Sequence, residues 1–380
     1  MGSRSWKPRR PLLAAAVTLS AAASLFLAGC AEANDNGQNT LQPKGPDAQK
    51  IDNLFWPIMI IASVIGIAII IATVYFALKF RYRAGTNDNP KQIHGNTRLE
   101  IGWTIVPALL LAVVAVPTIS TIFDLAAEPD ANALEVTVVG KQWWWQFEYT
   151  DAKVVTANEL VIPADRQVHV KLKACEADTC NVIHSFWVPE LAGTRDVVPG
   201  RTNALTMSAD EPGTFLGQCK EFCGLAHADM RFRVIAKTPA DFEQWLSDQQ
   251  QGPTQPLLEG EGADQQPAGP AEELIATKYQ CTNCHAFDDS SLATYGPNLT
   301  HLASRSVFAS GTFALNKKNL VDWVLNAPSM IPMQTDDPKC RPSVVEGCVG
   351  MPSFTEDVGD NPKMTRAEAE QIADFLLELQ

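Results

Sequence analysis

Two long uncharged runs near the N-terminus dominate the hydrophobic pattern of this 380-residue chain. Residues 55–78 and 101–123 contain no charged side chain, and each run can cross a bilayer core about 30 Å thick. The loop between them is basic, with Lys79, Arg81, Arg83, Lys91 and Arg98. Since basic loops stay on the cytoplasmic side, we predict a transmembrane hairpin over residues 51–126 with both flanks outside the membrane.

An export signal precedes the hairpin. A basic start is followed by an apolar stretch that ends at Cys30 in the sequence LAGC. This order is typical of a secretory signal peptide, and its last four residues resemble a lipoprotein cleavage site. We therefore expect a signal peptide over residues 1–29, lipidation of Cys30 and a loose polar tether over residues 30–50. The alternative is an uncleaved membrane helix with an incidental cysteine.

From Leu134 onward, alternation replaces the long apolar runs. Residues 134–138 and 168–172 alternate between apolar and polar positions, as half-buried strands do. Turn-forming pairs such as Pro199-Gly200 recur between the apolar runs. Short strands with regular turns over roughly a hundred residues predict a Greek-key β-barrel or sandwich over residues 130–237. This is the fold type of the blue-copper proteins, the cupredoxins.

Beyond residue 237 the chain divides into a polar linker and a helical module. Residues 238–269 contain a short helical segment followed by a Gln-, Gly- and Pro-rich stretch, which predicts a flexible connection. Over residues 366–379, apolar side chains recur with helical spacing and predict a closing helix. We expect residues 270–380 to form a separate all-α domain.

Composition narrows the classes of function. The formal net charge of −13 argues against a nucleic-acid-binding protein. Nine cysteines in a cytosolic protein would suggest zinc or redox motifs, whereas an exported chain allows both disulfides and metal-bound thiolates. Two pairs lie close in sequence, Cys175 with Cys180 and Cys340 with Cys348. Local disulfides are the simplest account of these pairs.

The densest group of potential metal ligands lies within residues 217–231. Two thiols, an imidazole and a thioether occur there, at Cys219, Cys223, His227 and Met230. These soft ligands suit copper, but a mononuclear blue-copper site uses a single cysteine. Two thiolates therefore suggest a dinuclear site, for which His184 is better placed than His169 as the second imidazole. Structural zinc is the alternative, although zinc would leave the methionine without a role.

A second redox motif opens the C-terminal domain. Residues 281–285 read Cys-Thr-Asn-Cys-His, the C-x-x-C-H pattern that attaches c-type heme. Cys281 and Cys284 would form thioethers and His285 would be an axial ligand; a redox-active dithiol is the alternative. A high potential requires methionine as the second axial ligand. We favour Met351, in a loop before the last helix, over Met333, although any methionine can equally fill a core.

Together these residues resemble subunit II of a heme–copper oxidase, in the form fused to cytochrome c (the caa3 type). The resemblance implies a dinuclear copper centre, CuA, bound by His184, Cys219, Glu221, Cys223, His227 and Met230. It implies that the Glu221 side chain also reaches Mg²⁺ at the contact with subunit I. It further implies that electrons enter at Trp143, the first residue of a tryptophan run, and that Glu100 lies at the mouth of a proton channel. From position alone, Trp143 can instead fill core and Glu100 can be interfacial.

On this resemblance, we predict a subunit of a respiratory cytochrome c oxidase in a bacterial cell membrane, with the copper and heme domains on the outer face. Its heme would be reduced by cytochrome c or a cytochrome bc complex. Electrons would pass through CuA to subunit I, where oxygen is reduced to water and protons are translocated; subunit III is a further implied partner. This chain alone has no oxygen-reducing site.

Two alternatives remain open from the residues. The first is a subunit of a CuA-containing nitric oxide reductase, and the second is a membrane-tethered electron carrier without a catalytic partner. The predicted hairpin of two spans argues against the carrier, because a lipid and a single helix would suffice for tethering. A quinol oxidase subunit is disfavoured, because that type lacks the copper ligands.

Overall fold

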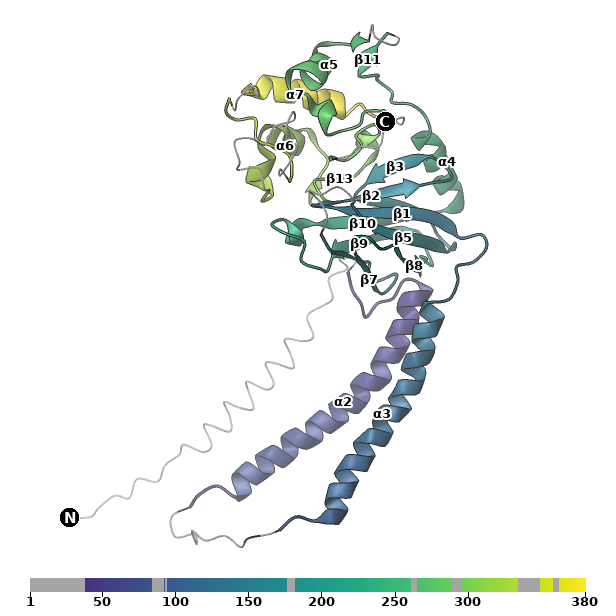
Figure 1. Cartoon of the computed structure of the whole chain (residues 1–380), viewed down its shortest axis with the longest axis vertical. Coiled ribbons are helices and arrows are strands. Elements are labelled where there is room, and N and C mark those ends of the chain that lie inside the picture. The colour runs from purple at the N-terminus through teal and green to yellow at the C-terminus, as the bar shows by residue number, and fades with distance from the viewer. Residues whose placement is uncertain are drawn as a thin grey trace, which may run out of the picture.

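A computed structural model describes residues 38–83, 92, 94–175, 182–260, 265–288, 295–333, 349–357 and 362–380. Two long helices extend from a β-sandwich, and a mostly helical C-terminal domain lies on the opposite side of that sandwich (Figure 1). The predicted signal peptide lies outside the described residues, as do four of the predicted site residues: Cys30, Cys180, Cys340 and Cys348.

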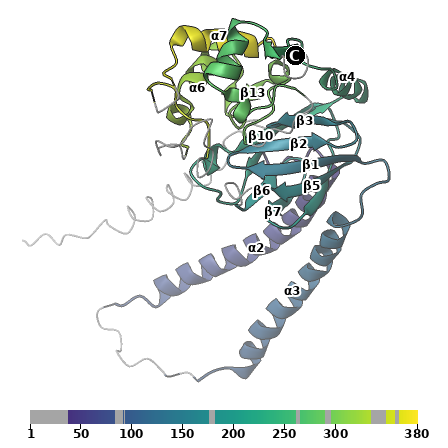
Figure 2. The ribbon, with the colours of Figure 1, turned by 45° about the horizontal axis from the view of Figure 1, so that its top comes forward.

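The two long helices are α2 (Pro46–Lys79), which begins at the sandwich, and α3 (Thr97–Leu125), which ends there; they lie side by side near the sandwich and diverge away from it (Figures 1 and 2). Both have the length and mean hydropathy of membrane spans, 2.7 and 2.3, and their apolar windows are not buried within the protein. Apolar side chains all around a helix suit contact with lipid. The predicted spans 55–78 and 101–123 therefore lie inside longer helices.

Residues 38–48, which we expected to belong to a loose tether, are bonded to the sandwich instead. The Lys44 amide donates to the carbonyl of Glu190 at 2.7 Å. The carboxylate of Asp47 is buried and accepts a hydrogen bond from the hydroxyl of Thr206 at 3.0 Å. Polar composition did not reveal these long-range bonds, so the tether prediction is wrong for this part. The segment joins the first long helix firmly to the sandwich.

The sandwich consists of two five-stranded sheets, in the orders β3-β2-β1-β5-β8 and β4-β10-β9-β6-β7. The strand bounds are β1 (Leu134–Lys141), β2 (Trp144–Tyr149), β3 (Val154–Ala157), β4 (Glu159–Pro163), β5 (Val168–Ala174), β6 (His184–Trp187), β7 (Thr194–Val197), β8 (Asn203–Met207), β9 (Gly213–Cys219) and β10 (Arg231–Lys237). The β1–β5 and β4–β10 pairs are parallel, and the other pairs are antiparallel. The predicted β domain is confirmed as a two-sheet sandwich.

An aromatic cluster joins the two sheets close to the predicted copper loop. The rings of Trp145, Phe186 and Phe232 lie with centroids 4.6–5.6 Å apart, and all three are almost fully buried. Such contacts add to the stabilisation that comes from burial of the rings. Gly217 lies against this cluster, because a Cβ at this position would come within 2.2 Å of the Phe232 ring. The core thus reaches the strand that ends at Cys219.

The expected linker 238–269 contains ordered elements. Helix α4 (Pro239–Gln249) packs against the sandwich through Phe242 and through Trp245, whose ring centroid lies 5.3 Å from that of Tyr149. Further along, β11 (Leu258–Glu259) pairs with β12 (Gln266–Pro267). These parts of the linker are therefore held on the two domains that flank it.

The C-terminal domain contains helices α5 (Pro270–Glu273), α6 (Lys317–Met330) and α7 (Arg366–Leu376). It also contains a hairpin of β13 (Val307–Phe308) and β14 (Phe313–Ala314), so the prediction of an all-α domain is corrected. The predicted closing helix is present but ends at Leu376. Figure 2 shows β13 at the boundary between this domain and the sandwich. Between its two strands the chain turns through residues with positive φ, among them Ser310.

Candidate metal centre and C-terminal pocket

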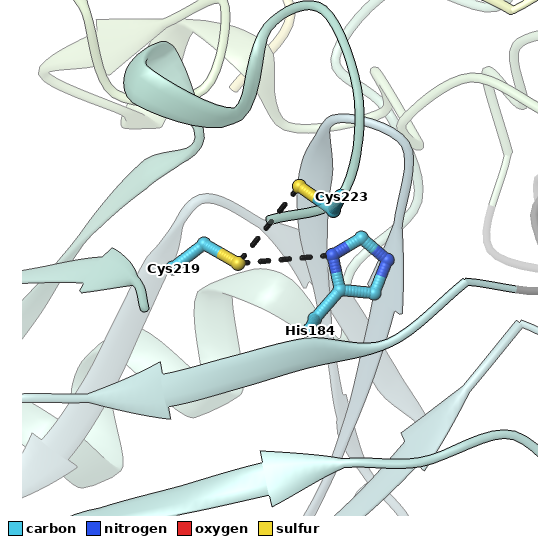
Figure 3. A group of neighbouring side chains, drawn as sticks. All are labelled: His184, Cys219 and Cys223. Atoms are coloured by element: carbon cyan, nitrogen blue, oxygen red, sulfur yellow. Dashed lines mark hydrogen bonds between the residues drawn. The ribbon is translucent and has the colours of Figure 1, made fainter. Parts of the chain in front are cut away.

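Two cysteines and a histidine converge where β9 ends and β6 begins. Sγ of Cys219 lies 3.9 Å from Sγ of Cys223 and 3.9 Å from Nδ1 of His184 (Figure 3). Both thiols are free, and a disulfide would bring the sulfurs to about 2.05 Å. The observed spacing suits two sulfurs that share metal ions at bond lengths of about 2.3 Å. Gly140 leaves room for the imidazole, because a Cβ there would lie 2.9 Å from the His184 ring.

The remaining predicted ligands surround the same sulfurs. Sγ of Cys223 lies 3.6 Å from Nδ1 of His227 and 3.6 Å from Sδ of Met230. The carbonyl oxygen of Glu221 lies 3.2 Å from Sγ of Cys219, while the Glu221 side chain is exposed. The structure therefore places two thiols, two imidazoles, one thioether and one carbonyl within a single cluster.

The turn between β1 and β2 holds this loop in place. Nε1 of Trp143 donates to the carbonyl oxygen of Cys223 at 2.9 Å, and Nε2 of Gln142 donates to the same oxygen at 2.6 Å. Gly224, the next residue, has a φ of +117°, which favours glycine. A Cβ at Gly224 would also lie 3.0 Å from the Trp143 ring. The tryptophan is thus a structural support for the metal loop.

The two thiols differ in pKa. Contact with Cys223, and then with His184, lowers the pKa of Cys219 to about 4 against the opposing effect of burial. The same contact, together with burial, raises the pKa of Cys223. Because thiolates are the form that binds metal, loading of this site releases protons.

A cavity lies between the C-terminal domain and the sandwich, and the predicted heme-attachment residues line it. Cys281, Cys284 and His285 contribute to its wall, and both thiols are free. Nδ1 of His285 lies 2.9 Å from the carbonyl oxygen of Pro297; a proton on Nδ1 in that bond leaves Nε2 available as a ligand. Burial lowers the pKa of His285, which favours the neutral imidazole. Gly296 allows this packing, since a Cβ there would lie 2.5 Å from the His285 ring.

Both candidate methionines line the same cavity. The amide of Met351 donates to Sδ of Met333 at 3.2 Å, so the two residues are direct neighbours. Met333 packs against the core of the sandwich, whereas Met351 packs against the core of the C-terminal domain. Met351 therefore belongs to the same domain core as the C-x-x-C-H segment, and its choice over Met333 stays a prediction.

Sequence analysis did not identify the part of the sandwich that lines this cavity. Lys141, Trp143, Trp144 and Asn158 belong to the sandwich and form a section of its wall. Because we predicted a separate domain joined by a flexible linker, we did not expect the sandwich to form part of the cavity wall. The run of tryptophans was the only signal in the sequence that pointed to an unusual aromatic surface.

The other predicted site residues in the described part of the chain are Glu100 and Cys175. Glu100 is in the first turn of α3, at the end remote from the sandwich (Figure 1). Cys175 is disulfide-bonded, and its pairing with Cys180 stays a prediction because Cys180 lies outside the described residues. The same holds for the Cys340–Cys348 pair.

Comparison with known proteins gives consistent matches. The model for the cytochrome c oxidase subunit II transmembrane domain matches residues 33–121, and the model for the periplasmic domain of that subunit matches residues 153–237. Cytochrome c oxidase subunit 2 of Alkalihalophilus pseudofirmus is 36% identical over 321 residues, which are 81% of this chain and 86% of that protein. The subunit of Bacillus subtilis is 31% identical over 335 residues, 83% of this chain and 89% of that protein. Quinol oxidase subunit 2 of Bacillus cereus is 33% identical over 233 residues, 60% of this chain and 77% of that protein.

Proposed function

Because the chain belongs to the cytochrome c oxidase subunit II family, we propose that it holds both a dinuclear CuA centre and a covalent heme c in one polypeptide. One observation carries this proposal: Trp143 bonds to the metal loop at Cys223 and also lines the cavity of the C-x-x-C-H segment. Two sets of redox ligands thus meet at one side chain. The longer matches to cytochrome c oxidase subunits than to the quinol oxidase subunit support the heme domain.

The metal cluster fits CuA in its donor set. Thiolates from Cys219 and Cys223, with imidazoles from His184 and His227, would hold the copper ions, assisted by the weak ligands Met230 and the Glu221 carbonyl. When bound, the dinuclear copper would supply one-electron redox chemistry. Burial of both cysteines and of His184 excludes water from these ligands. The exposed Glu221 carboxylate is free to reach Mg²⁺ at the contact with subunit I.

The cavity fits a c-type heme in the chemistry of its lining, which combines the C-x-x-C-H residues with apolar side chains from both domains. Cys281 and Cys284 would form the thioether bonds, with His285 and Met351 as axial ligands. Arg305 lines the cavity almost fully buried, and its Nε has no hydrogen-bond partner among the described residues. A guanidinium in that position suits an occupant that carries carboxylates.

The C-terminal domain changes the direction from which electrons reach Trp143. This side chain is only 6% exposed, so an external protein cannot dock on it. We propose that cytochrome c or a cytochrome bc complex delivers electrons to the C-terminal domain. They then cross at Trp143 to the copper loop and continue to subunit I, which reduces oxygen to water.

The surroundings of the complex follow from the same proposal. A signal peptide that ends before a lipidated Cys30, together with the hairpin, would place the sandwich and the C-terminal domain on the outer face of a bacterial membrane. Glu100, at the remote end of α3, would then lie on the cytoplasmic side, at the mouth of a proton channel into subunit I. Subunit III would complete the assembly.

Purification of the full chain in detergent with its partner subunits tests this function. We expect copper, covalent heme and oxygen uptake with reduced cytochrome c in the same complex. Reduction of nitric oxide without oxygen uptake would identify a nitric oxide reductase subunit instead. Recovery of the chain alone, with both cofactors but without a catalytic partner, would identify a tethered electron carrier.

A further inference from the structure

We propose that the β-sandwich forms one wall of the heme pocket, and that Glu159 fixes this wall against the C-terminal domain. The proposal rests on the function proposed above, because it takes heme as the occupant of the cavity. It adds a second task to the sandwich, which would shape the heme site as well as hold copper. Glu159 would be a positioning residue, since it acts through the segment that it binds.

The wall consists of side chains that are buried although they lie at the edge of their own domain. Lys141 and Trp144 line the cavity, and each is only 7% exposed. Nε1 of Trp144 donates to the carbonyl oxygen of Tyr295 in the C-terminal domain at 3.2 Å. Nζ of Lys141 lies 4.8 Å from the centre of the Trp144 ring, a distance at which a cation attracts an aromatic face. The two side chains thus brace each other against the cavity.

Glu159 is a charged group of the sandwich that bonds the C-terminal domain. Its side chain is 4% exposed, and Oε1 accepts hydrogen bonds from the amides of Ser306 (2.9 Å) and Val307 (3.1 Å). The hydroxyl of Ser306 donates to the same oxygen. Bonds to a carboxylate are stronger than neutral ones, and a buried carboxylate without them would be costly. Three donors from one short segment therefore hold that segment tightly.

The bound segment leads directly into the cavity. Val307 and Phe308 form β13 and line the cavity from the C-terminal side. At the far end of the same hairpin, the hydroxyl of Ser310 donates to the carbonyl of Trp143, and the carbonyl of Ser310 accepts from the amide of Arg231 at 3.2 Å. The hairpin is thus fixed to the sandwich at both ends. Loss of the bonds to Glu159 would let β13 move away from the sandwich and would open the contact between the two domains beside the heme pocket.

Opening of this contact between the domains would change the reduction potential of the heme. Water that enters a heme pocket stabilises the more highly charged oxidised state, so solvent access lowers the reduction potential. The copper site should be unaffected, because its proposed ligands lie on the other side of Trp143, at the start of β6 and between the end of β9 and Met230. Glu159 is therefore predicted to tune the heme and to leave CuA unchanged.

The test compares Glu159→Ala with Glu159→Gln in the full chain within its complex. The glutamine keeps an oxygen that can accept from both amides, whereas alanine removes the acceptor. Glu243→Ala, on the exposed face of α4, is the matched control for loss of a carboxylate. Hydrogen exchange at the Ser306 and Val307 amides, the heme reduction potential and the copper EPR signal are measured for each variant.

We expect Glu159→Ala to speed exchange at the two amides by roughly tenfold or more and to lower the heme potential, while Glu159→Gln and Glu243→Ala stay close to wild type. An Ala variant with unchanged exchange and unchanged potential would overturn the proposal. If Glu159→Ala does not fold, Trp144→Leu replaces it: a lowered heme potential with an intact copper signal supports the wall, and an unchanged potential refutes it. A folded wild-type chain without covalent heme would overturn the proposed function itself, and this result is visible before any variant is made.

Discussion

The metal loop and the C-terminal pocket collect their ligands in opposite ways. All the proposed copper ligands except His184 lie between Cys219 and Met230, on one loop that packs on the core of the sandwich. The C-terminal pocket is assembled from the C-x-x-C-H segment, the methionine segments and the sandwich. A local site depends on the fold of one domain, whereas a shared pocket depends on how two domains meet. The two sites should therefore respond differently to the same kind of damage.

Cys223→Ser should give the largest difference between its effect on the copper site and its effect on the heme pocket. Serine supplies a hard oxygen instead of a bridging thiolate, so we expect complete loss of the mixed-valence copper EPR signal. The heme absorption spectrum should stay unchanged, because the thioether cysteines lie in the other domain. Retention of the mixed-valence signal would show that the two sulfurs do not bridge.

Met351→His should change the heme pocket and leave the metal loop unchanged. Replacement of a thioether by an imidazole lowers the potential of a c-type heme, so the heme should become harder to reduce while the copper signal persists. Met333→His is the paired variant, since both side chains line the cavity. If only the Met333 variant changes the heme potential and spectrum, the choice of axial ligand is wrong.

Phe232→Ala should weaken the metal loop through the core beneath it. Removal of a fully buried phenylalanine costs about 3–5 kcal/mol, and Phe232 contacts both Trp145 and Gly217. We expect a lower unfolding temperature of the sandwich and reduced copper content, with covalent heme still attached. Calorimetry with metal analysis measures both. A single calorimetric transition shared by the sandwich and the C-terminal domain would show that the two domains unfold as one unit.

Glu368→Gln should produce the smallest effect, confined to the C-terminal domain. Glu368 and Thr365 form a capping box at the start of α7, and hydrogen bonds from Lys278 and then Thr365 lower the pKa of Glu368 to about 2. A carboxyl with a depressed pKa stabilises the fold above its usual pKa of 4.5, and this stabilisation is lost as the pH falls toward 2. We expect a loss of about 1 kcal/mol near neutral pH.

The pH dependence of unfolding distinguishes this role of Glu368 from a simple loss of packing. In the wild-type chain, the stability of the C-terminal domain should decline between about pH 5 and pH 2. The Gln variant should show a flatter profile over the same interval. Chemical denaturation followed by heme absorbance gives both curves, and parallel curves would exclude the proposed contribution.

Features that depend on local spacing could be predicted from the sequence, whereas contacts between segments that are distant in the chain could not. The transmembrane hairpin and the β domain follow from periodicity. The grouping of Cys219, Cys223 and His227 follows from ligand chemistry within a short stretch of sequence. No local pattern marks Glu159, because its hydrogen-bond donors lie far away in the chain, at Ser306 and Val307. The same limit applies to the tether, whose bonds to Glu190 could not be inferred from a polar composition.

The methionine ligand shows an intermediate case. The C-x-x-C-H motif predicts the first axial ligand from the sequence alone, but the second depends on which loop folds over the cavity. Met333 and Met351 lie in direct contact, so even the fold does not separate them by distance from the pocket. Domain packing favours Met351, because it lies on the core that contains Cys281.

One measurement tests most directly whether a single chain holds both redox centres: EPR spectroscopy of the purified full chain with copper and heme quantified in the same sample. The account predicts a mixed-valence dinuclear copper signal and a copper-to-heme ratio of about two to one, with the heme retained after denaturation. A mononuclear copper signal, zinc in place of copper, or the absence of covalent heme would contradict it.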